Sequence, residues 1–274
     1  MDIADKTVEL PGGWQAYLAW PRRVEQPLPG IVLIQEIWGV DEHIRDVAHR
    51  LVAAGYAVLA PDLYTLGGAR PALLSEPRVA RAKRFMDTVP ASAWATMMDP
   101  ARREDVLKAL EGEERVQIGE TIGLLMPPDR AARLPAQAEE LGRATQWLRE
   151  HVLCQGRKIG ALGFCVGGSL AALVALRDAR LGGTVMFYGA PPPFDKLGTL
   201  QSPILGLFGE DDPRLVPQLP DFERAMKDAQ KSLEVRVYPK TPHAFFNDTR
   251  SSYRAEAARD AWAQTLRFFA ATLS

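Results

Sequence analysis

The stretch Lys158-Ile159-Gly160-Ala161-Leu162-Gly163-Phe164-Cys165-Val166-Gly167-Gly168 decides how the chain folds. An apolar run of small residues, typical of a buried strand, leads into Gly163-x-Cys165-x-Gly167, and an Ala- and Leu-rich stretch of helical character follows at once. A sharp strand-to-helix reversal strains the backbone of its central residue and leaves no room for side chains two positions away, which explains both glycines. The pattern predicts a nucleophile elbow with cysteine at its apex.

The position of Cys165 suits a reactive thiol. A free thiol, with a pKa of about 8.5, is mostly protonated at neutral pH, whereas the thiolate is the nucleophile. The N-terminus of the following helix favours the anion, and a neighbouring base can take the proton. The alternative is a buried structural cysteine, since free cysteine is among the most buried residue types. Cys154 and Cys165 are too few to suggest a disulfide framework, so we expect a reducing, cytoplasmic location.

Composition narrows the class of protein. The chain has 274 residues, of which 47% are hydrophobic and 24% charged, as in soluble globular proteins. A net charge of -1 and the lack of a basic run argue against nucleic acid as a partner. Residues 1–6 do not resemble a signal peptide, and no apolar stretch is long enough to cross a bilayer. We therefore expect a small-molecule substrate, no membrane partner, and a monomer or homodimer.

Strand and helix patterns alternate along most of the chain. The patterns predict strands over residues 8–10, 15–20, 30–35, 56–60, 154–164, 184–188, 204–208 and 233–238, and helices over 43–54, 137–151, 222–229 and 253–273. Residues from about 65 to 135 contain helical pieces interrupted by prolines and no clear strand. This order predicts one α/β domain over 1–274, with a doubly wound, mostly parallel sheet, helices on both faces and a helical insertion at about 65–135.

Partners for the cysteine should lie at the carboxyl ends of the strands, where functional residues gather in open α/β sheets. Asp212 follows one late strand and His243 follows the next, in the order nucleophile, acid, base that α/β-hydrolases share. His243 would accept the thiol proton and Asp212 would orient the imidazole, with Asp211 as the alternative acid. Glu36 ends the predicted strand over 30–35. A carboxylate there must be paired, protonated or solvated, and the position favours a functional role.

Together these residues give the sequence a resemblance to the dienelactone hydrolase (carboxymethylenebutenolidase) family of the α/β-hydrolase superfamily. The matching motifs are Gln35-Glu36-Ile37-Trp38-Gly39-Val40, Ala60-Pro61-Asp62-Leu63-Tyr64, Gly163-Phe164-Cys165-Val166-Gly167-Gly168 and His243-Ala244-Phe245. A cysteine in place of serine, together with the glutamate, is specific to that family. The resemblance covers the chain outside most of 65–135.

The resemblance implies a chemistry and assigns roles. It implies a Cys165, His243 and Asp212 triad that opens the lactone ring of dienelactone to give maleylacetate through a thioester, without metal or organic cofactor. It further implies that Glu36 contacts the resting thiol and becomes its base once substrate binds. The backbone N–H groups of Ile37 and Val166 would form the oxyanion hole. Trp38 and Tyr64 follow strand ends and are candidate substrate contacts.

Two departures from the family pattern leave alternatives open. An arginine that binds the substrate carboxylate in well-known members is replaced by Asn247 here, which makes Asn247 a further candidate substrate contact. The second arginine would come from the unaligned segment, where Arg70, Arg78, Arg81 and Arg84 are all candidates. The insertion is interpreted as a lid, or as a peripheral surface insertion. A broad carboxylesterase, a non-catalytic binding protein and a redox sensor built on Cys165 are the competing interpretations.

Overall fold

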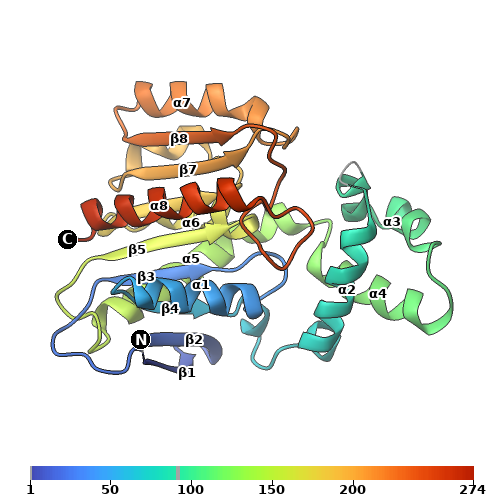
Figure 1. Ribbon diagram of the computed structural model, residues 1–274, viewed down its shortest axis with the longest axis horizontal. Helices are drawn as coiled ribbons and strands as arrows, with labels where there is room; N and C mark the ends of the chain where they lie inside the picture. Colours follow the sequence, from blue (N-terminus) through green and yellow to red (C-terminus); the bar gives the residue numbers. More distant parts are fainter. Residues whose placement is uncertain (1, 91–92) are drawn as a thin grey trace.

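The computed structural model describes residues 2–90 and 93–274, and Figure 1 shows their arrangement. Within that part, eight strands form one sheet in the order β1-β2-β4-β3-β5-β6-β7-β8. The strands are β1 (Ile3–Leu10), β2 (Trp14–Pro21), β3 (Gly30–Ile34), β4 (Ala57–Pro61), β5 (Ile159–Phe164), β6 (Leu181–Phe187), β7 (Ile204–Gly209) and β8 (Leu233–Tyr238). β1 and β2 are antiparallel, and β2 pairs antiparallel with β4. The pairs from β4 through β3 to β8 are parallel.

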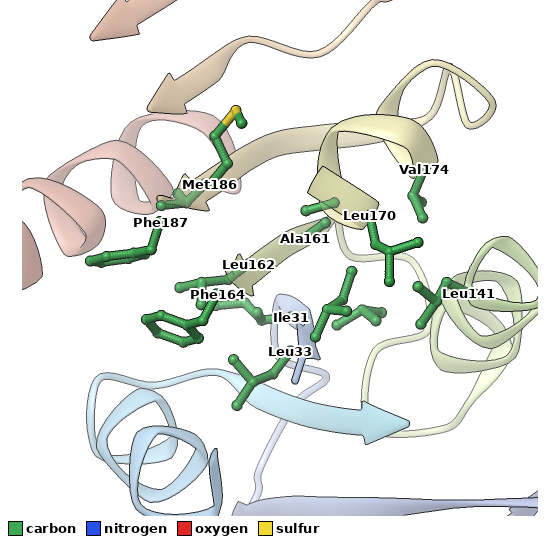
Figure 2. Packing of buried hydrophobic residues seen from close by; sticks show 14 of the residues in the cluster. Ile31, Leu33, Leu141, Ala161, Leu162, Phe164, Leu170, Val174, Met186 and Phe187 are labelled. Carbon is green, nitrogen blue, oxygen red and sulfur yellow. The ribbon is translucent and has the colours of Figure 1, made fainter. Parts of the chain in front are cut away.

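The central strands are apolar because both faces of the sheet are covered. Every residue of β3, β4 and β5 is buried, as expected for parallel strands that lie between two layers of helices. Figure 1 shows α1 and α8 in front of the sheet and α5 and α6 behind it. Figure 2 shows this packing from close by, with Leu170 and Val174 of α6 lying near Leu141 of α5. The α-helices are α1 (Glu42–Ala53), α2 (Glu76–Thr88), α3 (Pro100–Leu107), α4 (Gly112–Leu125), α5 (Arg130–Glu150), α6 (Val166–Ala175), α7 (Leu219–Asp228) and α8 (Ala255–Thr272).

Two details of the predicted elements were wrong. The helix predicted over 137–151 begins seven residues earlier, at Arg130, and Pro135 lies inside it. Pro135 is the sixth residue of α5, and the helix continues past it although its nitrogen has no hydrogen to donate. The strand that leads to the elbow begins at Ile159 and not at Cys154, which lies buried in the preceding turn.

We call the segment from Leu66 to Asp129 the cap. Its described residues form helices and contain no strand, and Figure 1 shows α2, α3 and α4 beyond the end of the sheet. The cap has its own hydrophobic cluster, separate from the one around the sheet. Ile37 and Trp38, which follow β3, belong to this cap cluster. The cap therefore packs on the edge of the sheet at which the parallel strands end.

Candidate active site

The strand-to-helix turn holds Cys165 in a conformation that is unusual for a side chain other than glycine. Its φ and ψ are 55° and -119°, between the end of β5 and the start of α6. A Cβ on Gly163 would lie 1.9 Å from the carbonyl oxygen of Gly167, and one on Gly167 would lie 2.4 Å from that of Gln35. Both glycines are thus required by close backbone contact, and the turn has the geometry expected of a nucleophile elbow.

His243 and Asp212 meet at the same edge of the sheet. His243 follows β8, Asp212 follows β7, and the His243 Nδ1 to Asp212 Oδ2 distance is 2.5 Å. Asp212 is 1% exposed and also accepts from the backbone N–H of Arg214. Asp211 makes no contact of its side chain with the imidazole among the described hydrogen bonds, so the structure brings together the acid that the sequence favoured.

The charges of the site favour a thiolate beside an imidazolium. Burial is the largest single influence on the Cys165 pKa and would raise it, but the influences of His243 and, more weakly, of Arg130 together outweigh it, and the pKa is lowered. Burial would likewise lower the pKa of His243, whereas the Cys165 thiolate and the hydrogen bond to Asp212 raise it to about 9. His243 Nε2 is buried without a hydrogen-bond partner of normal geometry in the described part of the chain. The attraction between His243 and the sulfur is therefore chiefly electrostatic.

Glu36 is buried but satisfied. It is 3% exposed, its Oε1 accepts from the Tyr188 hydroxyl at 3.1 Å, and its Oε2 accepts from the Asn247 side-chain amide at 2.7 Å. The implied resting hydrogen bond from the Cys165 thiol to Glu36 is absent from these contacts. Glu36 instead acts on Cys165 through its negative charge, which opposes the lowering of the thiol pKa.

Backbone strain concentrates around these residues. Five described residues other than glycine have a positive φ, and three of them lie at this site: Cys165, Tyr188 and Ala244, with values of 55°, 40° and 58°. Tyr188 donates to Glu36, and Ala244 adjoins His243. Such left-handed conformations cost energy and persist only where the surrounding packing imposes them. The fold therefore holds Cys165, Tyr188 and the loop that carries His243 in fixed positions.

The loop after β3 carries the first expected oxyanion donor. The Tyr64 hydroxyl donates to the carbonyl oxygen of Ile37 at 2.5 Å and thereby fixes that loop. In the part of the chain that the structure describes, the N–H groups of Ile37 and Val166 have no protein acceptor. Val166 begins α6, where the helix N-terminus favours negative charge. Both N–H groups are thus free to bind an oxyanion, and both residues line one cavity.

That cavity has a volume of about 230 Å³ and adjoins the elbow. Its wall is mostly apolar but includes Glu36, Tyr64 and two arginines of α5, Arg130 and Arg133. The full lining is Gln35, Glu36, Ile37, Leu63, Tyr64, Pro71, Leu74, Leu124, Leu125, Pro127, Arg130, Arg133, Gln137 and Val166. Of the expected substrate contacts, Tyr64 lies on this cavity. Trp38 and Asn247 do not: Trp38 packs against the cap, and the fully buried Asn247 uses its amide to hold Glu36.

None of the four arginines considered from the sequence lines this cavity. Arg78 binds Glu120, Arg81 donates to Gln117, Arg70 faces Asp62, and Arg84 lines a separate pocket. The cation that reaches the site is Arg130, which donates to the carbonyl oxygen of Leu125 and has no carboxylate partner among the described residues. Sequence reasoning missed Arg130, Tyr188 and Arg250. Arg130 immediately follows Pro127-Pro128-Asp129, which is the signal that could have placed a helix start there.

Comparison with known proteins shows which family the chain resembles. The model of the "Dienelactone hydrolase family" matches residues 14–273. The chain belongs to that family. It is 34% identical over 256 residues to a protein of Saccharolobus solfataricus named "Putative carboxymethylenebutenolidase", with 93% of this chain and 92% of the relative covered. It is also 29% identical over 264 residues to a Bradyrhizobium protein named "Probable 2-oxo-3-(5-oxofuran-2-ylidene)propanoate lactonase", with 92% and 86% covered.

The fold agrees as well. The crystal structure titled "Putative Dienelactone Hydrolase from Klebsiella pneumoniae subsp. pneumoniae MGH 78578" superimposes with a TM-score of 0.73 at 26% identity, covering 98% of this chain and 99% of that one. The predicted α/β-hydrolase fold is thereby confirmed. The family member described here is a hydrolase of the carboxymethylenebutenolidase class, which acts on small lactones or esters. No helix in the described residues is long and apolar enough to span a bilayer.

Proposed function

We propose that this protein hydrolyses a small lactone or ester through a thioester on Cys165. The observation that carries the proposal is the conjunction of the strained elbow at Cys165 with the His243–Asp212 pair at the same sheet edge. Burial would keep an isolated thiol protonated, yet the pKa of Cys165 is lowered because His243 lies beside it. A nucleophile next to a base that is oriented by a third group is the arrangement that covalent acyl transfer requires.

The first half of the reaction forms the acyl-enzyme. The Cys165 thiolate attacks the carbonyl carbon, and the oxyanion that forms accepts hydrogen bonds from the N–H groups of Ile37 and Val166. Collapse of this intermediate breaks the carbonyl carbon to ring or ester oxygen bond. The proton on Nε2 of His243 goes to the leaving oxygen, and its place beside the sulfur supports this role. In a lactone the leaving oxygen stays attached to the acyl chain, so the product of this step is an opened ring held as a thioester.

Water completes the turnover. Neutral His243 takes a proton from water, the hydroxide attacks the thioester carbonyl, and the thiolate leaves as the carboxylic acid is released. The hydrogen bond to Asp212 favours the protonated imidazole in both halves. Glu36, through its charge, keeps the resting thiolate from becoming too stable to react. A Glu36→Gln variant is expected to speed alkylation of Cys165 at neutral pH.

The cavity supports a small substrate with a negative charge. Its volume of about 230 Å³ is below the range of roughly 300–1,000 Å³ that is common for ligand pockets. The charge of Arg133 is shared with Asp129, 2.9 Å away, whereas Arg130 has no carboxylate partner in the described part. We assign Arg130 as the group that binds a substrate carboxylate, in place of the arginines considered from the sequence. The names of the relatives above, which denote lactone hydrolases, agree with such a substrate.

A broad carboxylesterase is the second candidate. It is favoured by Asn247, which replaces the arginine of well-known family members and therefore supplies no second positive charge. With Arg130 alone, the cavity has less preference for anions over neutral esters. A purely binding role finds less support, because neither the strained Cys165 nor the buried Asp212–His243 contact would be needed for it.

The test is hydrolysis of dienelactone and of a short-chain aryl ester by wild type, Cys165→Ala and Cys154→Ala. Cys154 is the matched control, since burial raises its pKa to about 12 and it lies outside the site. We expect lactone turnover that is lost in Cys165→Ala and kept in Cys154→Ala. Ester turnover without lactone turnover would favour the carboxylesterase. Turnover that survives in Cys165→Ala would contradict the proposed nucleophile.

A further inference from the structure

Arg250 is a buried arginine that no catalytic step above uses. Its side chain is 5% exposed, and its guanidinium lies 4.9 Å from the ring centre of Trp38 and 4.9 Å from that of Trp94. The two indoles are 6.2 Å apart and inclined at 86°, so Arg250 occupies the corner between them. Trp38 follows β3 and Trp94 belongs to the cap. A cation held over two indole faces attracts both.

The same guanidinium is tied to the cap by charge. Arg250 Nε donates to Asp87 Oδ1 at 2.6 Å, and Asp87 lies near the end of α2. The neighbouring hydroxyl of Ser251 donates to the same oxygen at 3.3 Å. A buried arginine without a partner would be costly, and Asp87 supplies that partner from a segment 163 positions away in the sequence. The segment after the catalytic histidine is thus attached directly to the cap.

Arg250 is also linked, through one intervening residue in each case, to the loop of Ile37 and to Glu36. Trp38 is the neighbour of Ile37, which lines the cavity. The backbone N–H of Arg250 donates to the carbonyl oxygen of Asn247 at 3.1 Å, and Asn247 holds Glu36. Arg250 itself does not line the cavity. It therefore acts on the reaction through the residues that it holds in place and through its charge, which reaches Tyr188, the partner of Glu36.

We propose that Arg250 is a positioning residue that fastens the cap to the oxyanion loop and to the histidine loop, so that the oxyanion hole is formed only when the cap is docked. The catalytic part of this inference rests on the proposed function. Arginine suits the task better than lysine because its planar guanidinium faces aromatic rings while its N–H groups bind a carboxylate. A lysine at position 250 keeps the charge but cannot make both kinds of contact at once.

The experiment compares Arg250→Lys and Asp87→Asn with Arg254→Lys as the matched control. Arg254 is exposed, and within the described residues its guanidinium donates to the carbonyl oxygens of Ser251 and Tyr253 alone. For each variant we would measure kcat and KM on the aryl ester, the rate of Cys165 alkylation by iodoacetamide, and amide exchange in α2. Thermal unfolding would show whether the fold is intact.

We expect Arg250→Lys to lower kcat by about 10- to 100-fold, less than or near the effect of deleting one oxyanion donor. KM should change less, and alkylation should stay within a few-fold of wild type because Arg250 contacts none of Cys165, His243 and Asp212. Amides of α2 should exchange faster in Arg250→Lys and, more weakly, in Asp87→Asn. A kcat equal to that of Arg254→Lys would overturn the proposal, as would a parallel loss of kcat and alkylation rate.

The exchange measurement separates this proposal from the proposed function. If the wild type hydrolyses neither substrate, the proposed function fails, but the fastening of the cap is still tested by exchange in α2. Faster exchange in Arg250→Lys than in Arg254→Lys would then support the fastening role. Equal exchange in the two variants would overturn it whatever the activity.

Discussion

The sheet and the cap are built on different hydrophobic clusters, and the two clusters carry different parts of the function. The sheet cluster joins residues from nearly the whole length of the chain, from Leu10 to Leu273. The cap cluster joins α2 and α4 with Ile37 and Trp38 of the loop after β3. The sheet fixes Cys165, Asp212 and His243. The cap, in contrast, packs on the oxyanion loop and, with the start of α5, encloses the cavity. If the proposed function holds, the sheet positions the reacting groups, and the cap shapes the cavity that admits the substrate.

The largest effect is expected from a substitution in the elbow, on the sheet side of this comparison. In Gly163→Ala, the new Cβ would lie 1.9 Å from the carbonyl oxygen of Gly167, and neither backbone can yield without unfolding the elbow. We expect loss of soluble protein, or a loss of activity of about 10³-fold or more, since a misplaced nucleophile forfeits most of the catalytic effect.

Gly142→Ala is the matched control, because its Cβ on α5 would meet no atom within 4 Å. It should leave activity unchanged and stabilise by up to about 1 kcal/mol. Expression, circular dichroism and ester turnover measure both variants. An active Gly163→Ala would mean that the elbow is not under the constraint described.

The next effect compares one core residue from each cluster. Leu162 in β5 and Ile122 in α4 are both fully buried. Truncation of either to alanine should cost about 2–5 kcal/mol, but in different units of the structure. Leu162→Ala should lower the global free energy of unfolding. Ile122→Ala should chiefly promote opening of the cap, so that amides of α2 and α4 exchange faster while those of β5 stay protected. Equal acceleration in β5 would show that the two clusters unfold as one.

A smaller effect tests the electrostatics of the sheet-bound site. The folded-state pKa of His243 is raised from 6.5 to about 9, so the stability that its protonated form contributes is fully present below pH 6.5 and is lost as the pH rises through about 9. We expect kcat/KM to fall above about pH 9, where His243 can no longer protonate the leaving oxygen.

Alkylation of Cys165 checks the same ion pair without a substrate. At pH 7, His243→Gln should slow alkylation by iodoacetamide about 10-fold or more, because a lowered thiol pKa depends on the imidazolium. An unchanged alkylation rate in His243→Gln would mean that the helix N-terminus alone stabilises the thiolate.

The smallest effect concerns substrate selection at the start of α5, where it adjoins the cap. Arg130→Ala should raise KM for dienelactone by about 10-fold or more, the typical scale of one hydrogen bond to a charged group, and leave KM for the neutral ester within about twofold. Arg133→Ala is the control, since Arg133 is exposed and pairs with Asp129. Steady-state kinetics on both substrates measures the difference. Equal changes on the two substrates would remove the assigned role of Arg130.

The sequence predicted the sheet side well and the cap side poorly, for a physical reason. Strand and elbow signals are local: apolar runs such as Ile31 to Ile34 and the glycines around Cys165 reflect contacts that any chain must make there. The order of Cys165, Asp212 and His243 then followed from the rule for strand ends. Which groups complete the site depends on contacts between distant segments. Tyr188 meets Glu36 across 152 positions, and Arg250 meets Asp87 across 163.

The arginine that lines the cavity, Arg130, lies where the cap joins α5. Composition does not distinguish an arginine that faces Glu120, such as Arg78, from one that faces the cavity. Asn247 is a second residue whose contacts could not be predicted from its place in the sequence. Its position in the motif indicated a substrate contact, whereas the fold buries it against Glu36. Such pairings depend on the three-dimensional fold and not on the local sequence.

The most direct test is to trap the acyl-enzyme. Wild type mixed with an excess of the aryl ester, quenched in acid within the first turnovers and digested with trypsin, should carry one acyl group on the peptide Ile159–Arg177. That peptide contains Cys165 but not Cys154. We predict that hydroxylamine removes the acyl group, that Cys154→Ala retains it, and that Cys165→Ala lacks it. Turnover by wild type without an adduct, or an adduct on Ser169 of the same peptide, would contradict a cysteine nucleophile.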